Sequence, residues 1–197
     1  VTNNTVGART ADAAANLAML EARFPTRLQV GAGGGVLVAS RFAAISRILI
    51  KGTAGSNTPL LTRAADCPLN EMAFHGGKVG LHIDGGHTSV GKVAAINCSE
   101  AGVQGYGGAV GYGSTIMAYQ CKYGVYLSRS THLGADGGLY ARGNETGLSS
   151  YGGQVTCAAE LSVLSTNELE GAVVDGGHLY APGLHANGNG RNGVQVQ

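Results

Sequence analysis

The stretch that decides the fold is "GLHIDGGHTSVGKVAAINCSEA" (residues 80–101), the first of five consecutive units built on one pattern. Each unit begins with a glycine, and the units are 22, 22, 23, 24 and 22 residues long. Self-similarity at a period of roughly 20 to 50 residues is the signature of repeat architectures. The sequence therefore predicts a stack of similar coils, led by Gly80, Gly102, Gly124, Gly147, Gly171 and, after the fifth unit, Gly193.

Apolar residues alternate with other residues inside each unit. Period-two alternation indicates short β-strands with one buried face. By this alternation Tyr126 and Tyr140 point outward. The pairs that we expect inside are Leu81/Ile83, Val125/Leu127, Ala172/Val174 and Val194/Val196 early in the units, and Val93/Ala95, Ile116/Ala118, Leu139/Ala141, Leu161/Val163 and Leu184/Ala186 later in them.

A unit of this length cannot bury its apolar face alone, so its stability requires stacking on neighbouring copies. Stacked coils would be separated by the strand spacing of about 4.8 Å. A side-chain amide recurs near the end of every unit, and amides stacked one above another can hydrogen-bond as a ladder. We expect this ladder to contain Asn97, Gln120, Asn144, Asn167 and Asn189.

The "N-x-x-x-G-V" corner and the "GG…V…A" order inside the units resemble right-handed parallel β-helices of the pectin-lyase-like kind. The charge-poor stretch "YGSTIMAYQCKYGVYLS" (112–128), rich in Gly, Ser and Tyr, is similar to the shafts of bacteriophage tailspikes and tail fibres. The resemblance covers about residues 72–197. It implies an all-β fold, a right-handed parallel β-helix solenoid, to which the sequence adds one short N-terminal helix.

The tetrad Asp-Gly-Gly-His occurs at 84–87 and again at 175–178. Its two Asp residues are four whole units apart, so the stack would separate them by about four strand spacings, roughly 19 Å. Paired catalytic carboxylates work within about 5–10 Å of each other. We therefore expect two structural corners, in which Asp bonds backbone amides and glycine supplies unusual dihedrals. The corner residues are Asp84, Gly85, Gly86, Asp175, Gly176 and Gly177, and the intervening units place Tyr106, Ser128 and Tyr151 in the Asp position.

The composition excludes several classes of ligand. Charged residues make up 13% of the chain, its formal net charge is +1, and Lys and Arg form no cluster, so the footprint of nucleic-acid binding is missing. The apolar runs fall far short of the roughly 20 residues that cross a bilayer, so no membrane insertion is expected. None of the four cysteines forms a Cys-x-x-Cys pair, which argues against a zinc site. We expect buried free thiols, no metal and no cofactor.

No catalytic residue is predicted. Unit length varies by only two residues, so the stretch 80–197 has no long loop that could wall a polysaccharide-cleaving groove. The acidic residues near the regular units are few, namely Asp136 with Glu145, and Glu160 with Glu168 and Glu170. The histidines are expected at surface or corner positions in different columns of the stack, at His82, His87, His132, His178 and His185.

Tyrosine is more informative about function than the acidic residues and histidines are, because all eight tyrosines lie in the stretch from Tyr106 to Tyr180. An exposed tyrosine can stack on a sugar or form a subunit interface, since its ring is apolar and its hydroxyl hydrogen-bonds. Tyrosines can also simply shield the ends of coils. The candidates for carbohydrate binding or for an interface are Tyr106, Tyr126, Tyr140 and Tyr151.

The sequence divides into a linker and helix (1–25), irregular first coils or a cap (26–79) and regular coils (80–197). The helix is predicted over 10–24, with Leu17, Leu20 and Phe24 as a narrow apolar stripe. This stripe suits docking on a neighbouring subunit or capping the open end of a solenoid. The chain begins without Met and ends in mid-strand, so we expect it to be part of a longer polypeptide.

The resemblance implies a structural or receptor-binding segment of a phage tail fibre or tailspike. Such a protein is made in the host cytoplasm, resides in the virion tail, forms a homotrimer, contacts other tail proteins and attaches to host-surface polysaccharide. Two alternatives remain open. One is a polysaccharide depolymerase, a glycosidase or lyase, whose site lies between subunits or outside this piece. The other is a bacterial surface adhesin with the same solenoid.

Overall fold

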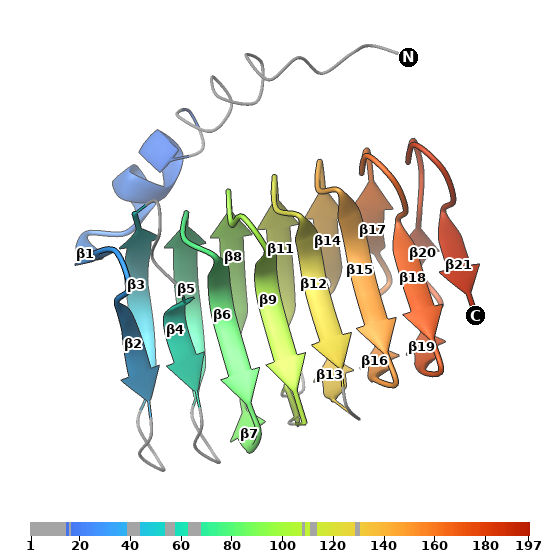
Figure 1. The fold of residues 1–197 in the computed structure, drawn as a ribbon, viewed down its shortest axis with the longest axis horizontal. Helices are drawn as coiled ribbons and strands as arrows, with labels where there is room; N and C mark the ends of the chain where they lie inside the picture. The colour runs from blue at the N-terminus through green and yellow to red at the C-terminus, as the bar shows by residue number, and fades with distance from the viewer. Residues whose placement is uncertain are drawn as a thin grey trace.

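Successive coils of the chain stack in register through three parallel β-sheets, as the ribbon in Figure 1 shows. The structure is a computed structural model, and it describes residues 15, 17–38, 44–53, 58–62, 68–107, 109–110, 114–128 and 131–197. Within these residues, two of the sheets have eight strands and the third has five. The linker at 1–9 and residues 10–14 of the expected helix lie outside the described residues.

Within the described residues, the five coils from β5 to β19 each contribute one strand to each sheet, and we name the sheets A, B and C in the order of the chain. Sheet A contains β1 (Thr26–Val30), β3 (Ile45–Gly52), β5 (Leu69–His75), β8 (Lys92–Ile96), β11 (Thr115–Tyr119), β14 (Leu139–Arg142), β17 (Ser162–Ser165) and β20 (Leu184–His185). Sheet B contains β2 (Gly35–Val38), β4 (Thr58–Thr62), β6 (Val79–Asp84), β9 (Ala101–Tyr106), β12 (Tyr123–Ser128), β15 (Thr146–Tyr151), β18 (Ala172–Asp175) and β21 (Val194–Val196). Sheet C contains β7 (His87–Thr88), β10 (Ala109–Val110), β13 (His132–Gly134), β16 (Gln154–Thr156) and β19 (His178–Tyr180).

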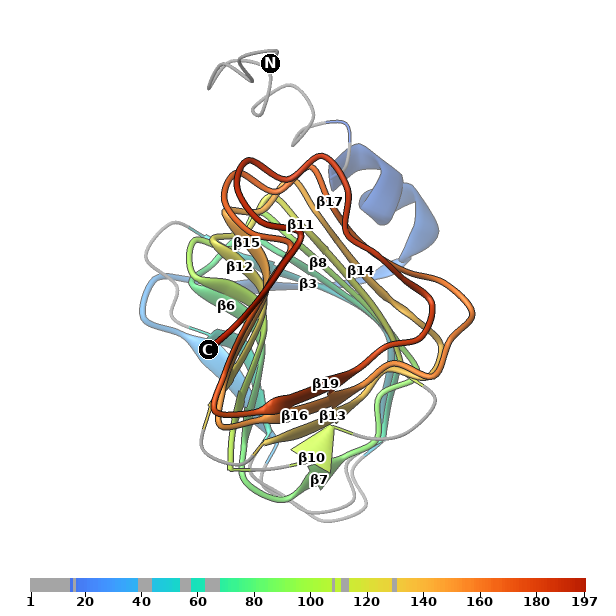
Figure 2. The same ribbon diagram turned by 90° about the vertical axis from the view of Figure 1, so that its right-hand side faces the viewer.

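The register of sheet B confirms the repeat found in the sequence. Residues that follow the leading glycines pair in one continuous column: Leu81, Val103, Val125, Leu148, Ala172 and Val194. Seen from the C-terminal end, the chain runs counter-clockwise as it approaches the viewer (Figure 2), which makes the solenoid right-handed. The predicted all-β, right-handed parallel β-helix with one short helix is confirmed.

The interior is a column of aliphatic side chains, as the alternation predicts. Val125 and Leu127 of β12 and Leu139 and Ala141 of β14 are buried in one core cluster. The neighbouring Tyr126 is only partly buried, as is Tyr140. Their burial therefore follows the period-two pattern on both sheets.

The predicted inward pair Leu161/Val163 is wrong by one residue. In sheet A, Tyr140 pairs with Val163 and Ala141 with Leu164, so Ser162 and Leu164 take the inward positions. Leu161 lies just before the strand and is 44% exposed. The Ser162 hydroxyl keeps a hydrogen-bond partner when it is buried, because it accepts a hydrogen bond from the Leu139 backbone N–H at 3.2 Å. An alternation of apolar residues cannot reveal a buried serine.

The first strands continue the same sheets. Strands β1, β3 and β5 pair in parallel and join β8, so sheet A is continuous from residue 26 onward. The pairing of β2 with β4 shifts register between Gly35 and Val36. Within the described residues, sheet C begins at β7.

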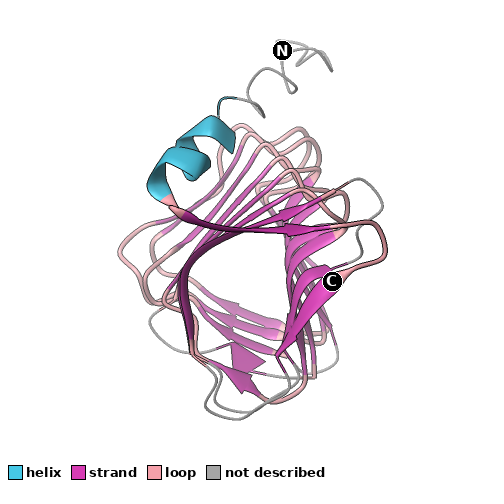
Figure 3. Ribbon diagram, turned by 90° about the vertical axis from the view of Figure 1, so that its left-hand side faces the viewer, coloured by secondary structure: helices cyan, strands magenta, loops and turns pink. Residues whose placement is uncertain are grey.

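The helix (residues 17–23) packs on the outer face of sheet A of its own chain. Leu20 and Phe24 are buried against Leu49, Ala73 and Ile96. Figure 3 shows the helix beside the coils, so it does not cap the open end of the solenoid. Leu20 and Phe24 therefore need no second chain for their burial, and the predicted homotrimer loses this argument.

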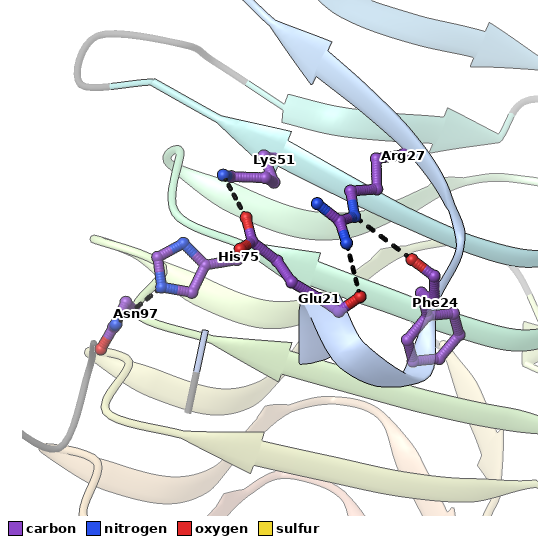
Figure 4. Close-up of polar contacts among 6 residues, drawn as sticks. All are labelled: Glu21, Phe24, Arg27, Lys51, His75 and Asn97. Carbon is purple, nitrogen blue, oxygen red and sulfur yellow. Dashed lines mark hydrogen bonds and ion pairs between the residues drawn. The ribbon is translucent and has the colours of Figure 1, made fainter. Parts of the chain in front are cut away.

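Polar contacts hold the helix in place (Figure 4). Lys51 on β3 donates to the Glu21 carboxylate at 2.6 Å, and Arg27 donates to the Glu21 and Phe24 carbonyl oxygens at 2.7 and 3.4 Å. The hydrogen bond from Lys51 is the main reason why the pKa of Glu21 is lowered. Burial lowers the pKa of the adjacent His75, whose Nε2 lies 3.1 Å from Nδ2 of Asn97.

The leading glycines form a column at which successive coils come unusually close. A Cβ atom at Gly80 would lie 2.6 Å from the Gly102 carbonyl oxygen. At Gly147 it would lie 2.5 Å from the Gly171 carbonyl oxygen and 2.8 Å from Nδ2 of Asn167. Only glycine fits here, because any side chain would push the coils and the asparagine amides apart.

The amide ladder beside this column contains three of the five predicted residues. Nδ2 of Asn144 donates to Oδ1 of Asn167 at 3.2 Å, and Nδ2 of Asn167 donates to Oδ1 of Asn189 at 3.0 Å. The same two oxygens accept the backbone N–H groups of Asn144 and Asn167 at 3.1 Å. Each rung thus satisfies buried donors and acceptors of the next coil.

Asn97 and Gln120 were wrongly placed in the ladder, because they lie one position earlier in the turn between sheets A and B. That position has a positive φ of 58° at Asn97, 56° at Gln120 and 62° at Gly143. Asparagine is enriched in this left-handed region among non-glycine residues. The corresponding ladder positions belong to Cys98 and Cys121, and the backbone N–H of Cys121 donates to Oδ1 of Asn144 at 2.9 Å.

We predict that Gly147→Ala destabilises the protein by about 3 kcal/mol, since the new methyl group overlaps both the next coil and the ladder. Gly31→Ala is the matched control, because a Cβ at Gly31 would meet nothing within 4 Å. Thermal denaturation followed by circular dichroism measures both. Equal melting temperatures for the two variants would contradict the close-approach argument.

Replacing Asn167 in the amide ladder should lower the free energy of unfolding more than replacing Asn97, the asparagine in the turn. Asn167→Ala leaves several buried donors and acceptors of neighbouring coils without partners, so we expect a loss of about 3 kcal/mol. Asn97→Gly should change stability by less than about 1 kcal/mol, because glycine adopts positive φ without strain. Denaturant titration compares the two variants, and an Asn97→Gly loss as large as that of Asn167→Ala would show that our assignment of the ladder is mistaken.

Candidate functional site

An aromatic ladder runs along the outer face of sheet B, with one ring from each of four successive coils. It consists of His82 on β6, Tyr106 on β9, Tyr126 on β12 and Tyr151 on β15. Neighbouring ring centroids are 5.3, 6.1 and 5.9 Å apart, and the rings are tilted by 46–54°. These separations lie in the range of about 4.5–7 Å that aromatic pairs favour.

The strand register explains why the rings meet. Tyr126 lies between the inward Val125 and Leu127, so its ring points outward. Tyr106 and Tyr151 occupy the column that also contains Asp84, Ser128 and Asp175. Because the coils stack without slippage, residues far apart in sequence become neighbours at strand spacing.

Of the four tyrosine candidates, three belong to this ladder and one does not. Tyr140 lies on β14 in sheet A, on a different face of the solenoid. Two contributors were not predicted from the sequence, His82 and Tyr123. The ring centroid of Tyr123 is 5.3 Å from that of Tyr126. The spacing Tyr123-x-x-Tyr126 was visible in the sequence, but at the strand entrance alternation does not tell which way a side chain points.

A polar cleft of about 420 Å³ adjoins the ladder at the entrance to β9 and β12. Its walls include Lys78, Glu100 and Lys122, together with Tyr106 and Tyr126. Lys78 pairs with Glu100 at 3.0 Å. The ammonium group of Lys122 lies 5.3 Å from the centroid of Tyr123, a cation–π contact.

A buried amide orders this cleft. Nε2 of Gln104, which is 4% exposed, donates to the Tyr106 hydroxyl at 3.0 Å and to Oε1 of Glu100 at 3.3 Å. Both groups are thereby held in position before any ligand arrives, which lowers the entropic cost of binding.

The Tyr126 hydroxyl stays protonated at neutral pH. Burial is the main cause that raises its pKa, and the neighbouring tyrosines and Glu100 raise it further. The ladder therefore offers a phenol that can both donate and accept a hydrogen bond.

The Asp-Gly-Gly-His tetrads lie at two separate corners between sheets B and C. The register places Asp84 and Asp175 four rungs apart, roughly 19 Å at strand spacing, so they form no common site. The glycines Gly85, Gly86 and Gly176 have φ values of 73°, 71° and 61°. Gly177 has a different constraint, because a Cβ there would overlap the Gly153 carbonyl oxygen.

The histidines are less scattered than expected. His87, His132 and His178 share one column of sheet C, where they alternate with Ala109 and Gln154. Two rungs separate successive histidines, roughly 10 Å, which is too far for them to share one metal ion. Among the described residues, no group of three or more His, Cys, Asp and Glu side chains could hold a metal ion.

The cysteines behave as buried thiols. Cys98, Cys121 and Cys157 are free and buried, as predicted, while Cys67 lies outside the described residues. Burial raises the pKa of Cys157 to about 11, and contact with Cys121 together with burial raises the pKa of Cys98 well above its usual value. Thiolate chemistry at neutral pH is therefore disfavoured at both residues.

No family model, curated protein or solved structure matches this chain at a significant level. Within the described part of the chain, no helix has the length and apolarity needed to cross a membrane.

We predict that Gly85→Val or Gly176→Val destabilises the protein by about 1–3 kcal/mol more than Asp84→Asn does. Nothing lies within 4 Å of a Cβ at either glycine, so the cost comes from the positive φ alone. Thermal denaturation of the single variants measures the difference. If Asp84→Asn proved the more damaging change, the corner would depend on the carboxylate rather than on the backbone.

Proposed function

We propose that this chain is a rigid β-helical segment of a bacteriophage tail fibre or tailspike, and that it binds host-surface carbohydrate without cleaving it. The observation that carries the binding proposal is the aromatic ladder with its ordered polar cleft. The phage assignment follows from the resemblance of the Gly/Ser/Tyr-rich repeat to tailspike and tail-fibre shafts. The protein then belongs in the virion tail, as a homotrimer joined to other tail proteins.

Carbohydrate suits this surface on chemical grounds. The C–H faces of sugar rings pack against aromatic rings, and sugar hydroxyls need donors and acceptors placed beside those rings. The ladder supplies Tyr106, Tyr126 and Tyr151 in a zigzag, since Tyr126 lies two residues before the column of the other two. The cleft supplies Glu100 and Lys122 next to them.

A non-enzymatic role agrees with the arrangement of the acidic tetrads. Asp84 and Asp175 are too far apart to act as the acid and base of a glycosidase. In the four coils of the ladder, the connections on either side of sheet B are only two to four residues long, so no long loop walls the outer face of this sheet. Such a surface suits attachment along a polymer.

We expect Tyr126→Ala to weaken glycan binding at least tenfold, about 1.4 kcal/mol or more, because its ring touches three other rings of the site. Tyr140→Ala, on the other outer face, is the matched control and should bind as the native protein does. The assay is binding to an array of bacterial surface polysaccharides, with melting temperatures as a check on folding.

Two results would contradict the proposal. Equal losses in the Tyr126→Ala and Tyr140→Ala variants would exclude the ladder as the binding surface. Release of reducing ends from a bound polysaccharide, abolished by Asp84→Asn or Asp175→Asn in a protein that melts normally, would favour the depolymerase alternative instead.

A further inference from the structure

A column of alternating charges runs beside the aromatic ladder. Strands β6, β9, β12 and β15 pair from their first residues, so the residues that precede them also stack on successive coils. These residues are Lys78, Glu100, Lys122 and Glu145. Backbone hydrogen bonds along this entrance support the same stacking, for example from the Glu100 N–H to the Lys78 carbonyl oxygen at 2.8 Å.

The charges in this column cancel. Over these four coils it contains two lysines and two glutamates, and Lys78 and Glu100 form an ion pair at 3.0 Å. The opposite edge of the ladder adds two further carboxylates, Asp84 and Asp175, in the column of Tyr106 and Tyr151. Arg191, which continues the first column, is paired with Glu170 at 3.8 Å. Among the described residues of these two edges, carboxylates therefore outnumber cationic groups. The desolvation of an acidic polymer lying along the ladder would not be compensated by them.

The ordered groups of the cleft match hydroxyls instead. The Glu100 carboxylate accepts hydrogen bonds, the lysine ammonium groups donate them, and the phenols of Tyr106 and Tyr126 do both. Gln104 holds Glu100 and Tyr106 at fixed places by the hydrogen bonds described above. A sugar hydroxyl, which both donates and accepts, is satisfied by such a mixed set.

We propose that the ligand of this surface is an uncharged polysaccharide that lies parallel to the solenoid axis and spans several coils. This inference rests on the proposed carbohydrate-binding function and adds the ligand's class and direction. The sugar faces contact Tyr106, Tyr126 and Tyr151 in turn, and the hydroxyls along one edge of the chain bond the Lys78–Glu100–Lys122 column.

The test compares acidic polysaccharides with their own carboxyl-reduced forms, for example polygalacturonate with the galactan obtained by reducing it, alongside dextran and mannan. Calorimetry on the full chain gives the affinities. For every pair that binds, we expect the reduced polymer to bind at least tenfold more tightly than the acidic one. Affinity should change less than about threefold between roughly 0.05 and 0.5 M salt, because no net charge is neutralised on binding.

The direction of the chain is tested with oligosaccharides of increasing length from whichever neutral polymer binds. Affinity should rise with length in the native protein, and Tyr151→Ala should remove much of that rise, since Tyr151 is the last ring of the ladder. If the affinity did not depend on oligosaccharide length, the proposal that the polysaccharide lies along the solenoid axis would be wrong.

The outcomes separate the two proposals. If Tyr126→Ala abolishes binding but the preferred polymer is acidic, or binding falls tenfold with salt, the neutral-ligand inference fails and the proposed function stands. If none of these polymers nor any bacterial surface polysaccharide on the array binds, or binding ignores Tyr126→Ala, both fail.

Discussion

The close approach of successive coils at the leading glycines is the constraint on which the rest of the structure depends. Where a Cβ would collide with the carbonyl oxygen of the next coil, only glycine allows the strands to reach hydrogen-bonding distance. The asparagine amides then fit against the backbone and bond from coil to coil. The close packing at the glycines and the hydrogen bonds of the asparagine amides thus require the same strand register at the corner between sheets A and B.

That register is also what assembles the candidate site. Neighbouring aromatic rings are 20 to 25 residues apart in sequence, and each is an ordinary outward side chain within its own coil. Only in-register stacking turns them into a continuous ladder. A slip of one residue in a single coil would turn its tyrosine toward the core and interrupt the ladder.

The corners of the solenoid share one backbone requirement, a positive φ, and meet it with different residues. The turn between sheets A and B has positive φ in successive coils, at Asn97, Gln120, Gly143 and Thr166. The corner between sheets B and C meets the same need with glycines, including Gly85 and Gly176. The repeated Asp-Gly-Gly-His tetrads are thus explained by backbone geometry, and the acidic side chains beside them need no shared chemistry.

The sequence by itself determined the coil length, the leading glycines and the inward faces of most strands, because steric exclusion and period-two alternation are local properties that every coil repeats. It also showed that the two tetrads belong to different coils. Tertiary structure alone decided that Ser162 replaces an apolar residue inside, that the amide ladder starts at Asn144, and that the helix stripe is covered by sheet A. It likewise decided that Tyr123 and His82 join Tyr126 while Tyr140 does not. These features depend on which residue of a neighbouring coil lies opposite, and a one-residue difference in coil length changes that neighbour without any mark in the local pattern.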